Sequence, residues 1–422
     1  MRVIHTADWH LGHTLHELSR EYEQRSFLEW LLKVLPKERI DALIVAGDVF
    51  DTANPPAAAQ RMWFEFVCNA RRKCPKLQIV VVGGNHDSAE RLDAPEPLFR
   101  ELGVHVIGGL PRRQRGTKIK LDFERMIVPL KDERGEVEAI VAAVPFVRPS
   151  DVPEESEGEG LFSEPALIAG IRTVYEQVIA AAKAKKKGSE ALIATGHCYV
   201  AGGQLSELSE RKIQSGNQHA LPLDIFLKDV AYVALGHLHC PQDLDKGRVR
   251  YCGSPIPLAM NEAAYAHSVT LLDIEGGRVK TSALEVPRKV ELMTVPESAK
   301  ELSEVLPLLK ALPVLEITAK EEARPFLEVR VSLPQFEPGL RRQIEQALEG
   351  RAPRLVKITV QYTGTGVPLA ESETVENLAE LEPEEVFRRC YERQYKQPPP
   401  EEWLFEFRNL IERAQHGADV TV

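Results

Sequence analysis

The sequence predicts an α/β protein, because short apolar runs alternate with amphipathic helices through its first hundred residues. The order is strand, helix, strand, helix, strand, which is typical of a central sheet with helices packed on it. Five apolar runs in the chain also end in Asp, Asn or His, and glycine precedes these residues in four of the five. Since ligands of α/β sheets gather at the carboxyl ends of strands, these ends predict a shared functional site.

The strand over 43–46 carries the residue on which the predicted site depends. Gly47 ends this apolar run and permits a tight turn that delivers Asp48 at the strand end. A carboxylate at that position faces the crevice at the sheet edge rather than the core. We therefore predict that Asp48 lies between two divalent metal ions and that the other strand ends supply the remaining ligands.

The first strand, over 2–7, ends in Asp8 and His10. These residues are two positions apart, so in an extended chain their side chains lie on one side and can reach one ion. An Asp-x-His triplet alone also occurs at ordinary strand ends, so this pair depends on the others for support.

Two amphipathic helices join the first three strands. The first contains Phe27 and Leu31 and is expected to end at Pro36. The second is expected to begin at Pro55-Pro56, with Asn54 as its cap. The second helix has a broad apolar surface that either packs on the sheet or forms a dimer interface. The residues of this surface are Met62, Trp63, Phe64, Phe66 and Val67.

The third strand, over 77–82, ends in Gly83-Gly84. Two glycines permit a sharp turn that places Asn85 and His86 in the crevice. Ser88 is expected to cap the helix that follows.

A helix over 164–187 precedes two further strands with the same kind of ending. The run over 191–195 ends in Gly196-His197, and the run over 230–235 ends in Gly236-His237-Leu238-His239. One such ending would carry little weight, but five in one chain are hard to explain as packing.

The rest of the chain reads as two smaller modules, which gives domains at 1–286, 287–366 and 367–422. The second module is a small α+β unit without a metal-ligand cluster in its sequence, and we interpret it as an accessory module that shapes substrate access. Its expected strands are 290–295, 314–319, 326–333 and 355–362, with helices over 298–312 and 339–348.

The third module is an acidic, helical tail that is interrupted at 397–400. It is more apolar than a free tail should tolerate, so we expect a protein partner to cover it. The apolar residues are Phe387, Trp403, Leu404, Phe405, Phe407, Leu410 and Ile411.

The candidate ligands form a mixed oxygen and nitrogen set of Asp, His and Asn. This set suits Mn²⁺, suits Mg²⁺ less well because several ligands are imidazoles, and leaves Fe or Zn open. Two ions about 3.5–4 Å apart can clamp the attacking and leaving oxygens of a phosphoryl transfer. The neutral amide of Asn85 fits such a site, because further carboxylates would repel an anionic substrate.

His86 is expected to act as an acid rather than as a ligand, donating a proton to the leaving alkoxide from the rim of the site. Asp87 either fixes the tautomer of His86 or caps the following helix. Cys198 and Cys240 each follow a candidate ligand. They are either redox-sensitive ligands or small side chains pointing to the opposite face, and the second interpretation is favoured.

Composition limits the class of protein. The 422 residues are 43% hydrophobic and 27% charged, without an apolar run long enough to span a membrane. The net charge of −10 argues against a wholly electrostatic nucleic-acid binder. Two basic clusters, over 112–120 and 183–187, are either solvated faces or DNA contacts. The six cysteines show no disulfide or zinc-site spacing, which predicts reduced thiols. The N-terminus turns polar too early for a signal peptide. Together these features predict a cytoplasmic protein.

The strand-end motifs together resemble the calcineurin-like metallophosphoesterases over about residues 1–286. The motifs are Asp8-Trp9-His10-Leu11-Gly12, Gly47-Asp48-Val49-Phe50-Asp51, Gly84-Asn85-His86-Asp87, Gly196-His197 and Gly236-His237-Leu238-His239. Within that superfamily, residues 5–12 and 251–257 are similar to the SbcD family, the nuclease subunits of bacterial SbcCD complexes. With the trailing modules, this likeness extends over nearly the whole chain.

The resemblance implies a four-layer α/β/β/α core in which Asp48 bridges two ions and His86 is the acid. One ion would take Asp8, His10 and His239, and the other would take Asn85, His197 and His237. The implied activity is Mn²⁺-dependent 3′-to-5′ exonuclease on double-stranded DNA and endonuclease on single strands and hairpins, in DNA repair and recombination.

The resemblance also implies partners. The second domain would cap DNA access, and the C-terminal helices would bind the coiled-coil base of an SbcC-type ATPase. A homodimer within a heterotetramer is implied as well, with Met62, Trp63, Phe64 and Phe66 as candidate interface residues.

Two other functions remain open at this point. One is a phosphatase or phosphodiesterase acting on a small substrate, although the chain has Asp51-Thr52-Ala53 where protein phosphatases of the superfamily have Asp-Arg-Gly. The other is a catalytically inactive subunit that tethers DNA, which the intact ligand set argues against.

Overall fold

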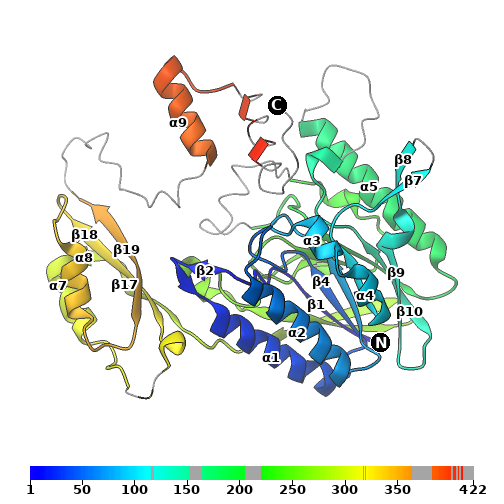
Figure 1. The fold of residues 1–422 in the computed structure, drawn as a ribbon, viewed down its shortest axis with the longest axis horizontal. Helices are drawn as coiled ribbons and strands as arrows, with labels where there is room; N and C mark the ends of the chain where they lie inside the picture. The colour runs from blue at the N-terminus through cyan, green and yellow to red at the C-terminus, as the bar shows by residue number, and fades with distance from the viewer. Residues whose placement is uncertain are drawn as a thin grey trace. The chain divides into compact units, whose positions relative to one another are not determined.

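The computed structural model describes residues 1–115, 118–151, 164–204, 220–316, 318, 320–363, 383–400, 403, 404, 407, 410 and 411. These residues form two compact units, the first mainly of residues up to Arg288 and the second mainly of residues from Lys289 on. The ribbon in Figure 1 shows the elements of each unit.

Two six-stranded sheets form the centre of the first unit within the described residues. The first sheet has the order β16-β15-β1-β4-β5-β6, and its strands β1, β4, β5 and β6 are parallel. Its strands are β1 (Arg2–Thr6), β4 (Ala42–Ala46), β5 (Gln78–Val82), β6 (Val104–Ile107), β15 (Ser268–Glu275) and β16 (Arg278–Glu285).

The second sheet has the order β13-β14-β12-β11-β10-β9, in which β10, β11, β12 and β14 are parallel. Its strands are β9 (Ile127–Lys131), β10 (Val137–Ala143), β11 (Ala191–His197), β12 (Tyr232–Gly236), β13 (Gln242–Leu244) and β14 (Val249–Tyr251). Two short hairpins, β2 (Thr14–Leu15) with β3 (Leu18–Ser19) and β7 (Arg112–Arg115) with β8 (Lys118–Leu121), lie outside these sheets.

Helices cover the outer face of each sheet, which gives four layers (Figure 1). Leu31 of α1 (Glu21–Lys37) and Trp63 of α2 (Ala57–Lys73) share a core with Leu43 of the first sheet. The opposite face of the first sheet packs on the second sheet, whose outer face is covered by α5 (Glu164–Lys185). The four-layer α/β/β/α core is thereby confirmed. Two short helices, α3 (Ala89–Asp93) and α4 (Glu96–Glu101), follow β5.

Two helix ends differ from the sequence-based expectation. Pro36 lies inside the last turn of α1, which ends at Lys37, and the backbone N–H of Glu38 still donates to the carbonyl of Val34. Asn54 does not cap α2, because Pro55 and Pro56 hold the chain extended and the helix begins after Pro56. Ser88 does cap α3, and its side chain accepts from the backbone N–H of Arg91.

The apolar surface of α2 belongs to the core rather than to an exposed face. Met62, Trp63 and Phe66 are each at most 3% exposed, and they pack with the first sheet. The expectation that these three residues form a dimer interface is therefore wrong, because the chain's own sheet covers them. Phe64 is 39% exposed.

His5 connects the two sheets at their buried faces. It lies on β1, while its ring nitrogens contact Tyr232 Oη at 2.9 Å and the carbonyl of Leu235 at 3.1 Å, both on β12. Because a carbonyl can only accept, Nε2 carries the proton and Nδ1 accepts from the tyrosine hydroxyl. Burial, reinforced by the charge of Arg250, lowers the pKa of His5 to about 3.

The buried neutral imidazole predicts a specific loss of stability in acid. A lowered native pKa means that the unfolded chain binds the extra proton, so the stability is complete above about pH 6.5 and falls as pH drops from there toward about 3. In urea unfolding with a chelator present, His5→Gln should flatten the decline near pH 5 by about 1.4 kcal/mol per pH unit. His16→Gln, at an exposed position, is the control and should leave the pH dependence unchanged. If the free energy of unfolding depends on pH equally in the wild type and in His5→Gln, the lowered pKa of His5 is contradicted.

The second unit is a parallel three-stranded sheet with two helices on one face. Its elements are β17 (Leu292–Glu301), α7 (Leu302–Lys310), β18 (Phe326–Leu333), α8 (Leu340–Ala347) and β19 (Arg354–Tyr362). The alternating residues Leu327, Val329 and Val331 of β18 face the helices, and this pattern forms the core of the unit.

Two expectations for this unit are wrong. Residues 298–301 continue β17 instead of starting a helix, because Lys300 and Glu301 still pair with β18. Among residues 314–316 and 318, Val314 makes only an isolated bridge to Arg351, so the expected strand is not formed there.

The described part of the tail contains α9 (Pro383–Tyr395), which ends before the proline-rich interruption at 397–400 as expected. Phe387 of α9 stacks on Phe407 with ring centroids 4.3 Å apart, and Leu404 is buried. Trp403 and Leu410 remain 56% and 45% exposed. Phe405 lies outside the described residues.

No described helix has the length and apolar character needed to span a membrane.

Candidate metal centre

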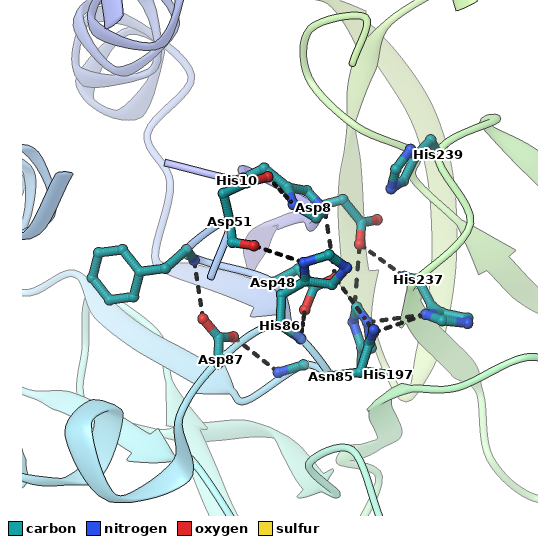
Figure 2. A network of polar contacts seen from close by, with 12 residues as sticks. Asp8, His10, Asp48, Asp51, Asn85, His86, Asp87, His197, His237 and His239 are labelled. Atoms are coloured by element: carbon teal, nitrogen blue, oxygen red, sulfur yellow. Dashed lines mark hydrogen bonds and ion pairs between the residues drawn. The ribbon is translucent and has the colours of Figure 1, made fainter. Parts of the chain in front are cut away.

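The carboxyl ends of parallel strands from both sheets meet at one place in the first unit (Figure 2). β1, β4 and β5 of the first sheet and β11 and β12 of the second end there. The structure brings together every residue that the sequence predicted for the two ions and the acid. These residues are Asp8, His10, Asp48, Asn85, His86, His197, His237 and His239.

The backbone that carries the ligands is held in an uncommon conformation. Asp8, His10 and Asp48 have φ of 53°, 44° and 49°, and His237 has φ of 103°, all in the left-handed region that favours glycine. Cross-strand hydrogen bonds from Asp8 N–H to the Gly47 carbonyl and from His10 N–H to the Asp48 carbonyl hold these turns. Such strain costs about 1–3 kcal/mol per residue and is typical of functional sites.

The first group of candidate ligands is Asp8, His10 and His239, whose ligand atoms lie within 4.8 Å of one another. The rings of His10 and His239 meet edge to face at 5.2 Å. His10 Nε2 also lies 3.4 Å from Asp48 Oδ2, so Asp48 borders this group.

The second group surrounds the other side of Asp48. His197 Nε2 lies 3.3 Å from Asp48 Oδ2 and 2.9 Å from Asn85 Oδ1. His237 Nδ1 lies 3.2 Å from both Asn85 Oδ1 and His197 Nε2. Neighbouring ligands of an octahedral ion lie roughly 3 Å apart, so these four donors have the spacing of one coordination shell.

Buried ligand atoms without hydrogen bonds support a pair of cations. Asp8 Oδ2 and His10 Nε2 are buried and make no hydrogen bond with the part of the chain that the structure describes. Unsatisfied buried polar atoms are costly, and metal coordination is one way to satisfy them. The residues present therefore fit divalent ions.

The charges at the centre favour a cation beside Asp48. Burial raises the pKa of Asp8 to about 7, lowers the pKa of His10 to about 4 and lowers the pKa of His237 well below its ordinary value. Burial also opposes charge on His197, but the carboxylates of Asp48 and Asp8 and the carbonyl of Ala46 together outweigh it and raise the pKa of His197 to about 9.

The His86 ring lies next to these ligands, half-buried at the edge of the centre. Its Nδ1 lies 2.7 Å from the carbonyl of Asp51, and its ring meets the His10 ring at 4.7 Å. Since the carbonyl accepts the Nδ1 proton, Nε2 is the ring nitrogen that can interact with a group bound at the metal centre. The backbone N–H of His86 donates to Asp48 Oδ1 at 3.0 Å.

The structure contradicts both roles expected of Asp87. Its carboxylate is fully buried and accepts backbone N–H groups from Val49, Phe50 and Gly84. Neither carboxylate oxygen is therefore directed at the His86 ring, and Ser88 rather than Asp87 caps α3. Asp87 instead joins the loop after β5 to the loop that carries Asp48 (Figure 2), so we correct its catalytic assignment to a positioning role.

Sequence reasoning missed several residues that support the ligands. The Asp51 carboxylate contacts His10, and Glu262 contacts His239. Arg148 donates to the carbonyl of Asp87 at 3.0 Å. Asp51 belongs to a recognisable motif and could have been found, whereas Glu262 comes from a short 3-10 turn, η5 (Met260–Ala264), without a sequence signal.

The open alternatives for cysteines and basic residues are partly resolved. Cys198 is buried, and the Tyr175 hydroxyl on α5 donates to its sulfur at 3.4 Å, so it points away from the ligands as the favoured interpretation predicted. Among the described residues, no candidate metal group includes Cys240. Lys183 and Lys185 pair with Asp229 and Glu124, which favours a solvated helix face for that cluster.

Comparisons with known proteins found two family models that match parts of this chain. The family model described as Calcineurin-like phosphoesterase matches residues 1–241, and the family SbcD_C, described as Type 5 capsule protein repressor C-terminal domain, matches residues 288–395. Among solved structures, TT1561 of Thermus thermophilus covers 67% of this chain and 98% of its own at 14% identity, with a TM-score of 0.34.

Several curated relatives are similar to this chain, and the three described here are each named as the D subunit of the nuclease SbcCD. The relative from Rhodobacter capsulatus is 41% identical over 392 residues, which is 93% of this chain and 94% of that protein. The relative from Escherichia coli is 32% identical over 401 residues, 92% of each chain. The one from Bacillus subtilis is 37% identical over 283 residues, 67% of this chain and 68% of that protein.

Proposed function

Because this chain belongs to the SbcD family of calcineurin-like phosphoesterases, we propose that it is a metal-dependent DNA nuclease that works with an SbcC-type ATPase. The observation that carries the proposal is the placement of Asp48, whose carboxylate lies within 3.4 Å of a histidine from each ligand group. A carboxylate between two imidazole-rich groups is the arrangement that a two-metal phosphodiesterase needs.

The two groups of ligands divide between two ions in this proposal. Asp8, His10 and His239 would hold one ion, Asn85, His197 and His237 would hold the other, and Asp48 would contribute to both. Two such ions, when bound, supply Lewis acidity to the scissile phosphate and to the attacking water. The imidazoles and the amide add no negative charge, so the centre can accept the phosphate of a DNA strand.

His86 supplies the proton in this mechanism. The Asp51 carbonyl fixes the orientation of its ring through Nδ1, so Nε2 can carry a proton toward the leaving 3′ oxygen. Asp87 and Arg148 act indirectly, because they hold the loop on which His86 lies.

The finer features of the proposal follow the family. We propose Mn²⁺ as the native metal, 3′-to-5′ digestion of double-stranded ends, cleavage of single strands and hairpins, and a role in DNA repair and recombination. Domain 287–366 caps DNA access, and domain 367–422 binds the ATPase in a heterotetramer built on a homodimer. The exposed Trp403 and Leu410 of the tail support the partner site, and six free cysteines support a cytoplasmic location.

A nuclease assay with the full chain tests the proposal. Hairpin-ended and blunt double-stranded DNA, labelled at the 3′ or the 5′ end, is incubated with Mn²⁺, Mg²⁺ or EDTA, with and without the ATPase partner. We expect Mn²⁺-dependent cleavage, no cleavage in EDTA, and mononucleotides released from 3′ ends. Turnover of a nitrophenyl phosphate without DNA cleavage would instead identify a small-substrate phosphatase, and turnover of neither substrate would identify a tethering protein.

A further inference from the structure

Two carboxylates outside the ligand set contact the histidines of a single group. His10 Nδ1 lies 3.1 Å from Asp51 Oδ1, and His239 Nδ1 lies 3.0 Å from Glu262 Oε1. Each carboxylate accepts the Nδ1 proton, which leaves Nε2 of each ring as the coordinating nitrogen. Both imidazoles of the group that contains Asp8 are therefore oriented by a negative charge.

Among the described residues, no carboxylate lies within hydrogen-bond distance of Nδ1 of a histidine in the other group. His197 Nδ1 donates to the neutral carbonyl of Ala46 at 2.9 Å, and its nearest carboxylate oxygen, Asp8 Oδ1, is 3.9 Å away. His237 Nδ1 contacts Asn85 and His197 within its own group, and its Nε2 makes no hydrogen bond with a described residue. The second group also lacks a carboxylate of its own, because it shares Asp48 with the first group.

Asp51 and Glu262 are themselves fixed in place. Glu262 is fully buried on η5, and its second oxygen accepts the backbone N–H of Leu258 at 2.7 Å. The backbone N–H of Asp51 donates to the carbonyl of Leu11, and the Asp51 carboxylate also contacts His13 Nδ1 at 3.0 Å. Each carboxylate therefore holds its histidine against a rigid backbone.

From this asymmetry we propose that Asp51 and Glu262 are positioning residues that make the two ion positions unequal. The position formed by Asp8, His10 and His239 binds a divalent cation more tightly and fills first. A carboxylate that accepts the second ring N–H of a coordinating histidine fixes the tautomer of that histidine and makes it a stronger ligand. Loss of such a carboxylate typically lowers metal affinity by about 10–100-fold. The inference depends on the proposed function only in that two ions bind.

The test is a titration of Mn²⁺ into the metal-free full chain, followed by calorimetry and by electron paramagnetic resonance. The wild type should bind one equivalent tightly, with the signal of an isolated ion, and then a second equivalent more weakly, with the signal of a coupled pair. Asp51→Asn and Glu262→Gln should each weaken the first step by about 10–100-fold and leave the second step within about threefold.

Asp93→Asn serves as the control, because Asp93 accepts the backbone N–H of Gly108 and contacts no candidate ligand in the contacts described. It should change neither step. Asp51 has a side chain that is 25% exposed, so its variant decides the test if Glu262→Gln fails to fold. Equal affinities in the wild type, or variants that weaken both steps equally or neither, would overturn the proposal. The binding assay uses no DNA, so it remains informative even if the chain fails to cleave DNA.

Discussion

Asp48→Asn is expected to reduce Mn²⁺-dependent DNA cleavage on the order of 10³-fold or more, since two bound ions supply several kcal/mol of transition-state stabilisation. The Asp48 carboxylate lies beside a histidine of each ligand group, at 3.4 Å from His10 and 3.3 Å from His197. The substitution removes the negative charge that both ions would share. It also removes the carboxylate that raises the pKa of His197. Single-turnover cleavage at saturating Mn²⁺ measures the loss, and calorimetry measures the bound ions.

Asp41→Asn is the matched control for this prediction. Asp41 directly precedes β4, whereas Asp48 follows it, and the Asp41 carboxylate accepts the backbone N–H of Arg2 at the opposite end of the strand. The control should cleave DNA like the wild type and bind the same number of ions. Cleavage by Asp48→Asn within tenfold of the wild type would mean that Asp48 does not bridge two ions.

His86→Ala is expected to lower kcat by about 10²–10⁴-fold, the usual contribution of a positioned acid. The number of bound Mn²⁺ ions should not change, because His86 is proposed to donate a proton and not to bind metal. The loss should nearly disappear for a nitrophenyl ester of thymidine 5′-phosphate, whose leaving group needs no proton. Comparing kcat for DNA and for this ester therefore isolates the acid role.

The same variant also tests the opposite assignment of His86. One group of potential ligand atoms within 4.8 Å of one another contains His10, Asp48 and His86, so the ring is close enough to take part in binding. If His86→Ala loses one ion, or loses equal activity on both substrates, His86 is a ligand and not the acid. His105→Ala, at a half-buried position on β6, is the control and should leave both activities unchanged.

The strand-end residues could be predicted because their chemistry and their position in the fold coincide. Asp8, Asp48, Asn85 and His197 each lie at the end of a short apolar run that is typical of a buried strand. Parallel strands then place their carboxyl ends together, so local patterns were enough to assemble a site from five segments. The four-layer order required the resemblance to a known family, because periodicity alone does not say which sheet packs on which.

The residues that the sequence did not predict depend on contacts between distant segments. Asp87 looked like a partner of the adjacent His86, yet its carboxylate is used by the backbone of Val49 and Phe50, 38 and 37 positions away. Glu262 supports His239 from a turn with no regular pattern. The apolar residues of α2 had two possible partners, and only the packed sheet shows that Trp63 faces inward.

Two errors in the expected element ends have physical causes that the structure shows. Pro36 is tolerated in the last turn of α1, where the helix ends one residue later in any case. The polar segment at 298–301 had helical composition, but pairing with β18 keeps it extended. Tertiary contacts thus decided the cases in which local preference was weak.

The most direct test of a shared Asp48 is anomalous scattering from crystals of the full chain grown with Mn²⁺. If Asp48 is shared, two manganese peaks should lie about 3.5–4 Å apart, with the Asp48 carboxylate between them. One peak should lie beside His10 and His239 and the other beside His197 and His237. A single peak bound without Asp48, or two peaks too far apart to share it, would show that Asp48 does not bridge two ions.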